Sequence, residues 1–323
     1  MKLRATHLIL LSLFTVLIFA APLTAQTDQK AILVTGASSG IGRNIAERLA
    51  KDGHFVYAGA RKEADLAELS AIENIQGVRL DVTVQADIDA AVAFITEEGR
   101  GLYAVVNNAG VAVFTPMNET PEKDIDFVFN VNVYGPYRIN KAFTPMLVAS
   151  QGRTTIISSI SGYIAGERGG TYSMSKFAVE AYTDAFAAEM AADGVHVSAV
   201  QPGAYKSKIR EKVAMHALKV TEETKDTVDD EGQKAIDDMV ARNDALKDPD
   251  EVSDAVVRAL FEEDPHRRYM VTPNEGQAKA TIEASLQRML ELNGDQVYSY
   301  DRDELVAMLD GLLAGTEAVV EAE

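Results

Sequence analysis

The sequence predicts a doubly wound α/β fold, in which helices cover both faces of one parallel sheet. Two observations lead to this prediction. Seven short apolar runs, rich in Val and Ile, alternate with segments of helical period. A glycine-rich turn also joins the first apolar run to the first helix. Alternation of strands and helices requires right-handed crossovers, which place helices on both sides of a parallel sheet.

The predicted strands follow one another along a single domain. They are residues 31–35, 55–59, 78–80, 103–106, 154–158, 195–200 and 269–271. A first helix is predicted over 41–50, where Ile41, Ile45 and Leu49 share one face. We expect a domain over 26–272, a charged helical insertion at about 206–247, and a helical extension over 273–323. In the extension, one predicted helix ends near Leu292 and another spans 303–313.

The first residues have the pattern of an export signal. Lys2 and Arg4 precede an apolar run over 8–21, and small residues follow it. This run is shorter than the roughly 20 residues of a membrane-spanning helix. We therefore expect a signal peptide over 1–25, cut after Ala25, and a protein that is periplasmic or otherwise extracytoplasmic. The alternative is an uncleaved segment that anchors the protein to the membrane.

Composition excludes several classes of protein. The 323-residue chain is 47% hydrophobic and 25% charged, as ordinary globular proteins are. With 31 basic and 49 acidic residues its net charge is −18, which argues against nucleic-acid binding. The absence of cysteine excludes disulfides, thiolate catalysis and Cys-ligated metals. The five histidines have no ligand spacing, so no metal is predicted.

The turn over 36–42 has the properties of a dinucleotide site. Gly36 permits the tight turn, Gly40 lets the backbone approach a pyrophosphate, and Gly42 lets the helix pack closely on the strand. The N-terminus of the helix supplies unpaired N–H groups to the phosphates. The other residues predicted to contact the cofactor in this turn are Ser38, Ser39 and Ile41.

The end of the second strand predicts which dinucleotide binds. An acidic residue there would favour NAD by binding the ribose 2′-hydroxyl. The chain has Arg61 instead, whose guanidinium suits a 2′-phosphate, so NADP is preferred over NAD. The alternative for Arg61 is a solvated surface side chain. Asp81 follows the third strand, where its carboxylate can accept a hydrogen bond from the adenine amino group.

Tyr172 and Lys176 form a candidate acid/base pair. Their i, i+4 spacing places them on one helix face. A free tyrosine has a pKa near 10, and a neighbouring ammonium is expected to lower that pKa by favouring the phenolate. The pair is therefore a plausible general acid/base.

Together these motifs resemble the short-chain dehydrogenase/reductase family, over about residues 30–272. The resemblance rests on motifs in the family's order and spacing: Thr35-Gly36-x3-Gly40-x-Gly42, Asp81-Val82, Asn107-Asn108-Ala109-Gly110, Asn132, Ser159, Tyr172-x3-Lys176 and Pro202-Gly203. It implies a Rossmann fold and an enzyme in which Tyr172 exchanges the proton with the substrate oxygen. Ser159 is then expected to polarise the carbonyl, and Lys176 to lower the Tyr172 pKa and bind the nicotinamide ribose. Asn132 is expected to hold a water in a proton relay.

The resemblance also decides between neighbouring candidates. Ser158 and Ser161 compete with Ser159, but only Ser159 has the family's separation from Tyr172. Asn130 likewise competes with Asn132, which stands at the family's distance from Asn108. The resemblance further implies cofactor contacts from Val82, Asn108, Ala109, Gly110, Pro202, Gly203 and Ser207. Ser207 replaces the family's usual Thr and keeps the hydroxyl.

The resulting prediction is an NADP(H)-dependent oxidoreductase that interconverts a carbonyl and a secondary alcohol. Local sequence at 56–61 and 132–135 is most similar to the hydroxysteroid/retinol branch. The resemblance also implies a homodimer or tetramer with a small-molecule substrate. The alternative is a non-catalytic dinucleotide-binding sensor or scaffold. An export signal favours that alternative, because free NADPH is not expected outside the cytoplasmic membrane.

Overall fold

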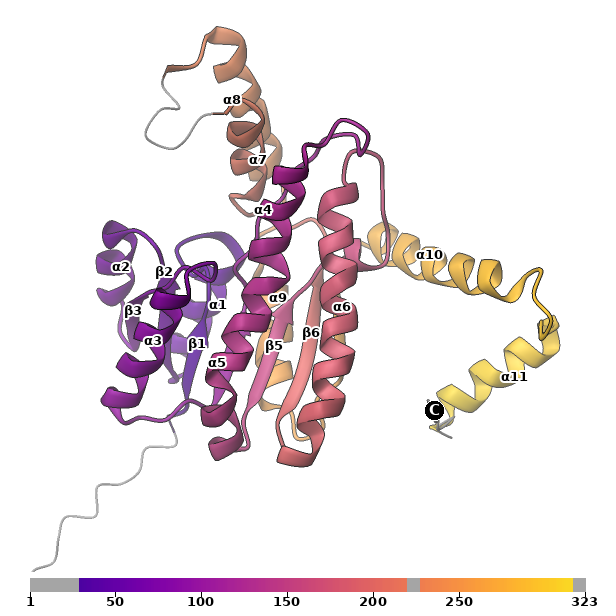
Figure 1. Cartoon of the computed structure of the whole chain (residues 1–323), viewed down its shortest axis with the longest axis horizontal. Helices are drawn as coiled ribbons and strands as arrows, with labels where there is room; N and C mark the ends of the chain where they lie inside the picture. The colour runs from indigo at the N-terminus through magenta and orange to yellow at the C-terminus, as the bar shows by residue number, and fades with distance from the viewer. Residues whose placement is uncertain (1–28, 220–226, 316–323) are drawn as a thin grey trace, which may run out of the picture.

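The computed structural model describes residues 29–219 and 227–315, and its centre is one parallel sheet (Figure 1). The strand order is β3-β2-β1-β4-β5-β6-β7, and every neighbouring pair is parallel. The strands are β1 Ala31–Val34, β2 Phe55–Ala60, β3 Ile75–Arg79, β4 Ala104–Asn107, β5 Arg153–Ile157, β6 His196–Pro202 and β7 Arg268–Val271. The predicted doubly wound sheet is confirmed. The predicted signal segment lies outside the described residues.

Helices cover both faces of the sheet (Figure 1). On one face lie α1 Gly40–Lys51, α2 Glu63–Ser70 and α9 Asp250–Phe261. On the other lie α3 Gln85–Glu98, α4 Glu122–Asn132, α5 Tyr134–Ser150 and α6 Gly170–Met190. Short 3-10 turns occur at η1 Ile160–Gly162 and η2 Ala191–Asp193.

The central strand β1 explains why its sequence is continuously apolar. Ile32 and Val34 pack into the core beneath α1 and α9. Ala31 and Leu33 point the opposite way, into the core beneath α3 and α5. Alternate residues of a strand face opposite sides of a sheet, so both sets must be apolar when both faces are covered.

Strand β3 begins three residues earlier than its apolar run suggested. It pairs with β2 from Val56↔Ile75 to Ala60↔Arg79, although Gln76 and Gly77 are polar or small. The strand lies at the edge of the sheet, where burial is less complete and pairing with β2 decides its extent.

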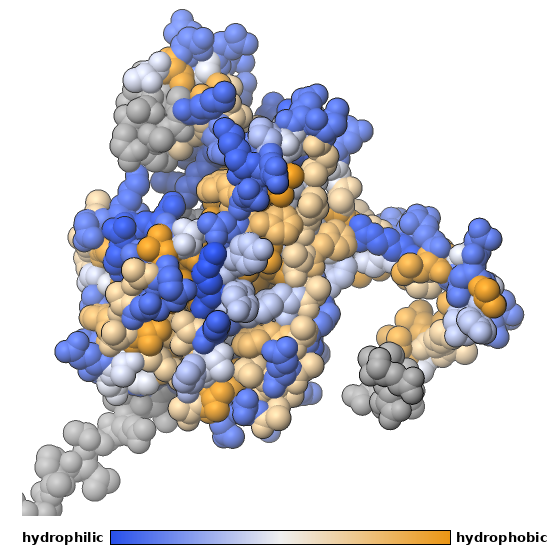
Figure 2. All heavy atoms as spheres, viewed as in Figure 1, coloured by the Kyte–Doolittle hydropathy of each residue, from blue (hydrophilic) through white to orange (hydrophobic). Residues whose placement is uncertain are grey.

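The insertion and the C-terminal extension are helical, as predicted. The insertion holds α7 Ile209–Ala217 and α8 Asp230–Asp244, and the extension holds α10 Glu275–Asn293 and α11 Arg302–Leu313. Apolar side chains join α7 to α8, and they include Met215, Leu218, Met239 and Val240. The extension projects from the body, with exposed apolar side chains (Figures 1 and 2). No helix in the described ranges is long and apolar enough to cross a bilayer.

Candidate active site

One cleft of about 380 Å³ collects almost all of the predicted site residues. It opens at the carboxyl ends of the parallel strands, where ligands bind in open α/β sheets. The predicted residues that line it are Gly36, Ser38, Ser39, Gly40, Ile41, Gly42, Arg61, Asp81, Val82, Asn108, Ala109, Gly110, Ser159, Tyr172, Lys176, Pro202, Gly203 and Ser207. Asn132 is the one predicted residue outside the lining.

Glycine is required at three positions of the loop between β1 and α1. Gly36 and Gly40 have φ of +66° and +59°, a region that residues with a Cβ rarely adopt. At Gly42, a Cβ would lie 2.2 Å from Asn108 Nδ2 and 2.5 Å from the carbonyl oxygen of Gly36. At Gly40, a Cβ would lie 3.2 Å from Cβ of Ser207, so the insertion approaches the loop here.

Helix α1 begins without a side-chain cap. Ser39 is its N-cap residue, yet the Ser39 hydroxyl caps no backbone N–H. The first N–H groups of any helix lack partners within the helix, and they carry its positive dipole end. Ser38–Gly42 all line the cleft, so these donors are available to an anion bound there.

A second loop is hydrogen-bonded to the glycine loop across the point where the strand order reverses. The Thr35 hydroxyl accepts from the backbone N–H groups of Asn108 and Ala109, both at 3.0 Å. Asn108 Nδ2 donates to the carbonyl oxygens of Thr35 and Gly36 at 3.0 and 3.1 Å. The loops after β1 and β4 thus form one rigid floor.

Arg61 and Asp81 lie together at the far end of the cleft. Arg61 follows β2 with its side chain 65% exposed, 3.7 Å from an Asp81 carboxylate oxygen. Thr83 donates to Asp81 through its backbone N–H at 2.9 Å and its hydroxyl at 2.7 Å. Burial acts to raise the pKa of Asp81, but the Thr83 hydrogen bonds and the Arg61 charge lower it overall. Asp81 is therefore a fixed acceptor beside an accessible guanidinium.

At the other end, α6 brings Tyr172 and Lys176 to Ser159. The Tyr172 phenol lies close enough to Ser159 for that residue to act on its pKa, while the Ser159 hydroxyl itself donates to the carbonyl oxygen of Pro202 at 3.5 Å. Lys176 Nζ lies 5.5 Å from the centre of the Tyr172 ring and donates to the carbonyl oxygen of Ile157 at 2.8 Å. The three side chains come from two segments, and the structure brings them into one constellation as the spacing suggested.

The predicted effect of Lys176 on the Tyr172 pKa is not found in this structure. Burial raises the pKa of Tyr172 to about 12, against a smaller lowering by the Ser159 hydrogen bond. Burial also lowers the pKa of Lys176 to about 8, although the charge of Glu180 opposes this. Loss of solvation disfavours both charged forms, and it outweighs the attraction that the helical spacing implied.

Asn132 connects the cleft loop to α6 through its side chain. Its Oδ1 accepts from the backbone N–H of Val111, and its Nδ2 donates to the Val111 carbonyl, both at 2.9 Å. Nδ2 also lies 3.0 Å from Ser175 Oγ. The Asn132 carbonyl has no i+4 donor because residue 136 is proline, which lacks an N–H. The side-chain amide of Asn132 is thus engaged by Val111 and Ser175.

The alternatives to Ser159 and Asn132 occupy different positions. Ser158 and Ser161 also line the cleft. However, the Ser158 hydroxyl is buried without a partner among the described residues. Asn130 accepts a hydrogen bond from Arg138 through its carbonyl and does not line the cleft.

Sequence reasoning missed Gln277, which reaches the cleft from the C-terminal extension. Its Oε1 accepts from the backbone N–H of Ala204 at 2.8 Å, beside the Pro202-Gly203 turn. A Cβ on Gly203 would lie 2.3 Å from this oxygen, so Gly203 allows the contact. No local pattern marks Gln277, because its partner is far away in the sequence.

Basic residues of the insertion were also missed. Lys208, Arg210 and Lys212 line the cleft at the start of α7. Here the signal was present, since four cations occur within residues 206–212.

In the described part of the chain, no group of three or more His, Asp or Glu side chains is arranged to hold a metal ion.

Comparisons with known proteins agree with this arrangement. A family model described as short chain dehydrogenase matches residues 30–217. The mitochondrial D-beta-hydroxybutyrate dehydrogenase of Rattus norvegicus is 32% identical over 269 residues, covering 76% of this chain and 78% of its own. The uncharacterized oxidoreductase YbbO of Escherichia coli K12 is 32% identical over 252 residues, covering 77% and 88%.

Solved structures share the fold. A short-chain dehydrogenase from Streptomyces avermitilis superposes with a TM-score of 0.65 at 24% identity, covering 90% of this chain and 98% of its own. An actinorhodin polyketide ketoreductase with NADPH superposes with a TM-score of 0.63 at 28% identity, covering 76% and 96%. The sheet, the cleft and these similarities agree, and the chain belongs to the short-chain dehydrogenase family of oxidoreductases.

Proposed function

We propose that the protein is an NADP(H)-dependent oxidoreductase that interconverts a carbonyl and a secondary alcohol. One observation carries the proposal. The same cleft is lined by the glycine loop at one end and, at the other, by Tyr172, Ser159 and Lys176, with Lys176 Nζ 5.5 Å from the centre of the Tyr172 ring. A sensor or scaffold would not need a proton donor in that position.

The residues present fit a dinucleotide. The uncapped start of α1, with Gly36 and Gly40 at positive φ, suits the pyrophosphate. Asp81 suits the adenine, and the exposed Arg61 guanidinium suits a 2′-phosphate. When bound, the nicotinamide supplies a hydride to the carbonyl carbon or accepts one from the alcohol carbon. The similar ketoreductase solved with NADPH supports this choice of cofactor.

Side chains of α6 and of the turn after β5 transfer the proton and stabilise the charges that form. In reduction, the Tyr172 hydroxyl donates its proton to the carbonyl oxygen, and the O–H bond of the phenol breaks as that of the alcohol forms. Ser159 donates a hydrogen bond that polarises the carbonyl. Lys176 stabilises the resulting phenolate, and a water on the Asn132 carbonyl returns the proton from solvent. In oxidation the same proton moves the other way.

Burial of Tyr172 decides its protonation state before the reaction. With its pKa raised to about 12, the phenol is protonated at neutral pH. This is the state from which it donates a proton in carbonyl reduction, and for oxidation the phenol must first lose that proton. Phe114, whose ring centre lies 6.1 Å from that of Tyr172 in an edge-on arrangement, adds an apolar surface to this end of the cleft and suits a substrate with an apolar body.

The test is reduction of a panel of ketones by the purified protein with NADPH, followed by loss of the reduced-nicotinamide absorbance. We expect turnover with at least one ketone, preferably one with an apolar body. Tyr172→Phe should reduce kcat by about 10³-fold because the proton donor is lost, while the Kd for NADPH changes little. A Tyr172→Phe variant with near-normal kcat would contradict the assignment.

We further propose a homo-oligomer. Exposed aromatic and apolar side chains lie on α4, α5 and α6, namely Phe127, Tyr134, Tyr137 and Met174. Figure 2 shows apolar atoms gathered over these helices. Light scattering is expected to give a mass of two or four chains.

The proposed export signal has its own test. The mass of the single mature chain would show whether it is cut after Ala25.

A further inference from the structure

A buried carboxylate lies on α6 one turn beyond Lys176. Glu180 is 6% exposed and follows Tyr172 and Lys176 at successive four-residue steps. Residues four apart on a helix have Cβ atoms about 6 Å apart. A buried carboxylate requires donors or an opposite charge, because it has lost its hydration.

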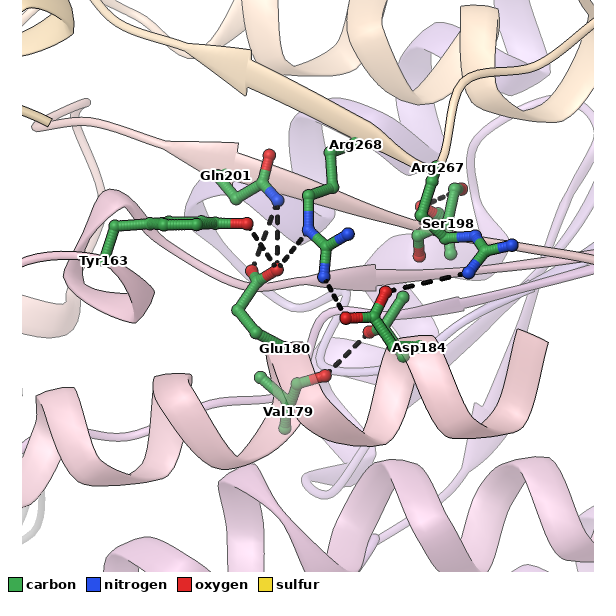
Figure 3. Close-up of polar contacts among 10 residues, drawn as sticks. Tyr163, Val179, Glu180, Asp184, Ser198, Gln201, Arg267 and Arg268 are labelled. Atoms are coloured by element: carbon green, nitrogen blue, oxygen red, sulfur yellow. Dashed lines mark hydrogen bonds and ion pairs between the residues drawn. The ribbon is translucent and has the colours of Figure 1, made fainter. Parts of the chain in front are cut away.

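Three donors hold the Glu180 carboxylate (Figure 3). Arg268 Nε of β7 donates to Oε2 at 2.9 Å, and the Tyr163 hydroxyl donates to the same oxygen at 3.2 Å. Gln201 Nε2 of β6 lies 3.3 and 3.2 Å from the two oxygens. Close to this negative charge, burial raises the pKa of Tyr163 to about 12, so Tyr163 remains a donor. These contacts fix the position of Glu180 relative to the sheet.

The charge of Arg268 is shared with a second carboxylate. Its Nη2 donates to Asp184 at 2.7 Å, one further turn along α6. Asp184 is 52% exposed and also lies 3.6 Å from Arg267, so water screens this outer pair. Inside the protein, the Glu180 carboxylate is paired with Arg268, and its charge also acts on Lys176, four residues before it on α6. Lys176 itself donates to a neutral carbonyl, that of Ile157.

We propose that Glu180 is a positioning residue of the reaction, whose buried carboxylate is the counter-charge that keeps Lys176 an ammonium ion beside Tyr172. The inference rests on the proposed function. The stabilisation acts through space, since Lys176 Nζ is occupied by the Ile157 carbonyl. The electrostatics agree, because the charge of Glu180 opposes the lowering of the Lys176 pKa by burial. An ammonium is needed there to stabilise the phenolate that remains after Tyr172 has donated its proton.

The Glu180–Arg268 ion pair can be broken from either side, which separates an electrostatic role from a structural one. Glu180→Gln removes the negative charge and should move the titration of Lys176 to lower pH by about one unit. Arg268→Gln removes the competing cation and should move it to higher pH. Asp184→Asn is the matched control, because it also loses an Arg268 contact but lies farther from Lys176, and it should leave the titration unchanged. If the ion pair had only a structural role, Glu180→Gln and Arg268→Gln would shift the Lys176 titration in the same direction.

The measurement is NMR of the full-length protein labelled with ¹³C at the lysine Cε atoms, with and without NADPH. Loss of one signal in Lys176→Met assigns the Lys176 resonance. In parallel, the rate of ketone reduction should fall with rising pH as Lys176 loses its proton, and Glu180→Gln should move this fall to lower pH. Melting temperatures check that each variant is folded.

Two outcomes would overturn the inference: a Glu180→Gln titration equal to wild type, or shifts of the same sign in Glu180→Gln and Arg268→Gln. Failure of the proposed function is distinguishable, because it appears as no turnover by the wild type. The Lys176 titration requires no turnover and tests Glu180 in either case. If Glu180→Gln does not fold, the Lys176 titration in Arg268→Gln still tests the inference. A shift to higher pH supports it, and a shift to lower pH contradicts it.

Discussion

The two ends of the cleft are built by different means. At the glycine loop, the binding groups are backbone N–H groups, and the residues that matter are those that lack a side chain. At α6, the working groups are side chains, and the residues that matter are buried polar ones that most proteins would exclude. The first end is set by shape and the second by electrostatics. Substitutions at the glycine loop should therefore change dinucleotide binding, whereas substitutions on α6 should change stability and its dependence on pH.

The largest effect on cofactor binding is expected at Gly42. In Gly42→Ala, the new methyl group overlaps the Asn108 amide and the carbonyl of Gly36, so the floor of the loop must move. We expect the Kd for NADPH, measured by fluorescence titration, to rise about 100-fold. Gly166→Ala, where a Cβ meets no atom within 4 Å, is the control and should bind normally. If Gly42→Ala binds NADPH as wild type does, the shape of the glycine loop does not determine binding at this end of the cleft.

At Lys176 we expect a gain: removing the buried ammonium should raise the free energy of unfolding. Burial lowers the pKa of Lys176 from 10.5 to about 8, so between these pH values the unfolded chain binds a proton that the folded chain has released. The free energy of unfolding therefore rises with pH across this window, and below pH 8 the buried ammonium costs about 3 kcal/mol.

Lys176→Met should therefore unfold in urea at pH 7 with a free energy about 1–3 kcal/mol higher than wild type, less the hydrogen bond to Ile157. The rise in stability between pH 8 and 10.5 should disappear in this variant. Lys279→Met removes an exposed lysine and should change neither quantity. The prediction is contradicted if Lys176→Met is less stable than wild type and its free energy of unfolding still rises with pH as in wild type. The buried ammonium would then not destabilise the folded protein.

A smaller effect is expected at Arg61, where an exposed side chain serves the binding end. Arg61→Ala should weaken NADPH binding about 10-fold and leave NADH binding unchanged, because only NADPH carries the 2′-phosphate. Arg79→Ala, at the end of the neighbouring strand and similarly exposed, is the control. Equal weakening of both dinucleotides would remove the basis for the NADP preference.

The smallest effect is expected at Gln277, which contacts the cleft from outside the sheet. Gln277→Leu loses the acceptor for the Ala204 N–H and should raise the KM for NADPH about threefold. Gln277→Glu keeps an acceptor oxygen and should retain most of the affinity. Gln287→Leu on the same helix, where the Gln287 side chain donates an exposed hydrogen bond to Glu291, should behave as wild type. No difference between Gln277→Leu and Gln287→Leu would confine α10 to a structural role.

Local patterns predicted the sheet and most of the cleft. Apolar runs located every strand except the edge strand β3, because a strand buried on both faces must be apolar throughout, as β1 shows. The edge strand β3 was misplaced because pairing, and not apolarity, decides its extent. The glycine loop was predictable because the positive φ of Gly36 and Gly40 belongs to the local turn between strand and helix, although the close approach to Gly42 comes from the distant Asn108.

What the sequence alone determined was which residue types meet at which strand ends, since spacing along a helix or across a turn is a local property. The tertiary structure alone decided how strongly each group is solvated and which distant partner it has. That is why the Tyr172 pKa is raised and not lowered, why Gln277 reaches the turn after β6, and why Glu180 shares Arg268 with Asp184. Desolvation depends on everything that surrounds a group, and no window of sequence contains that information.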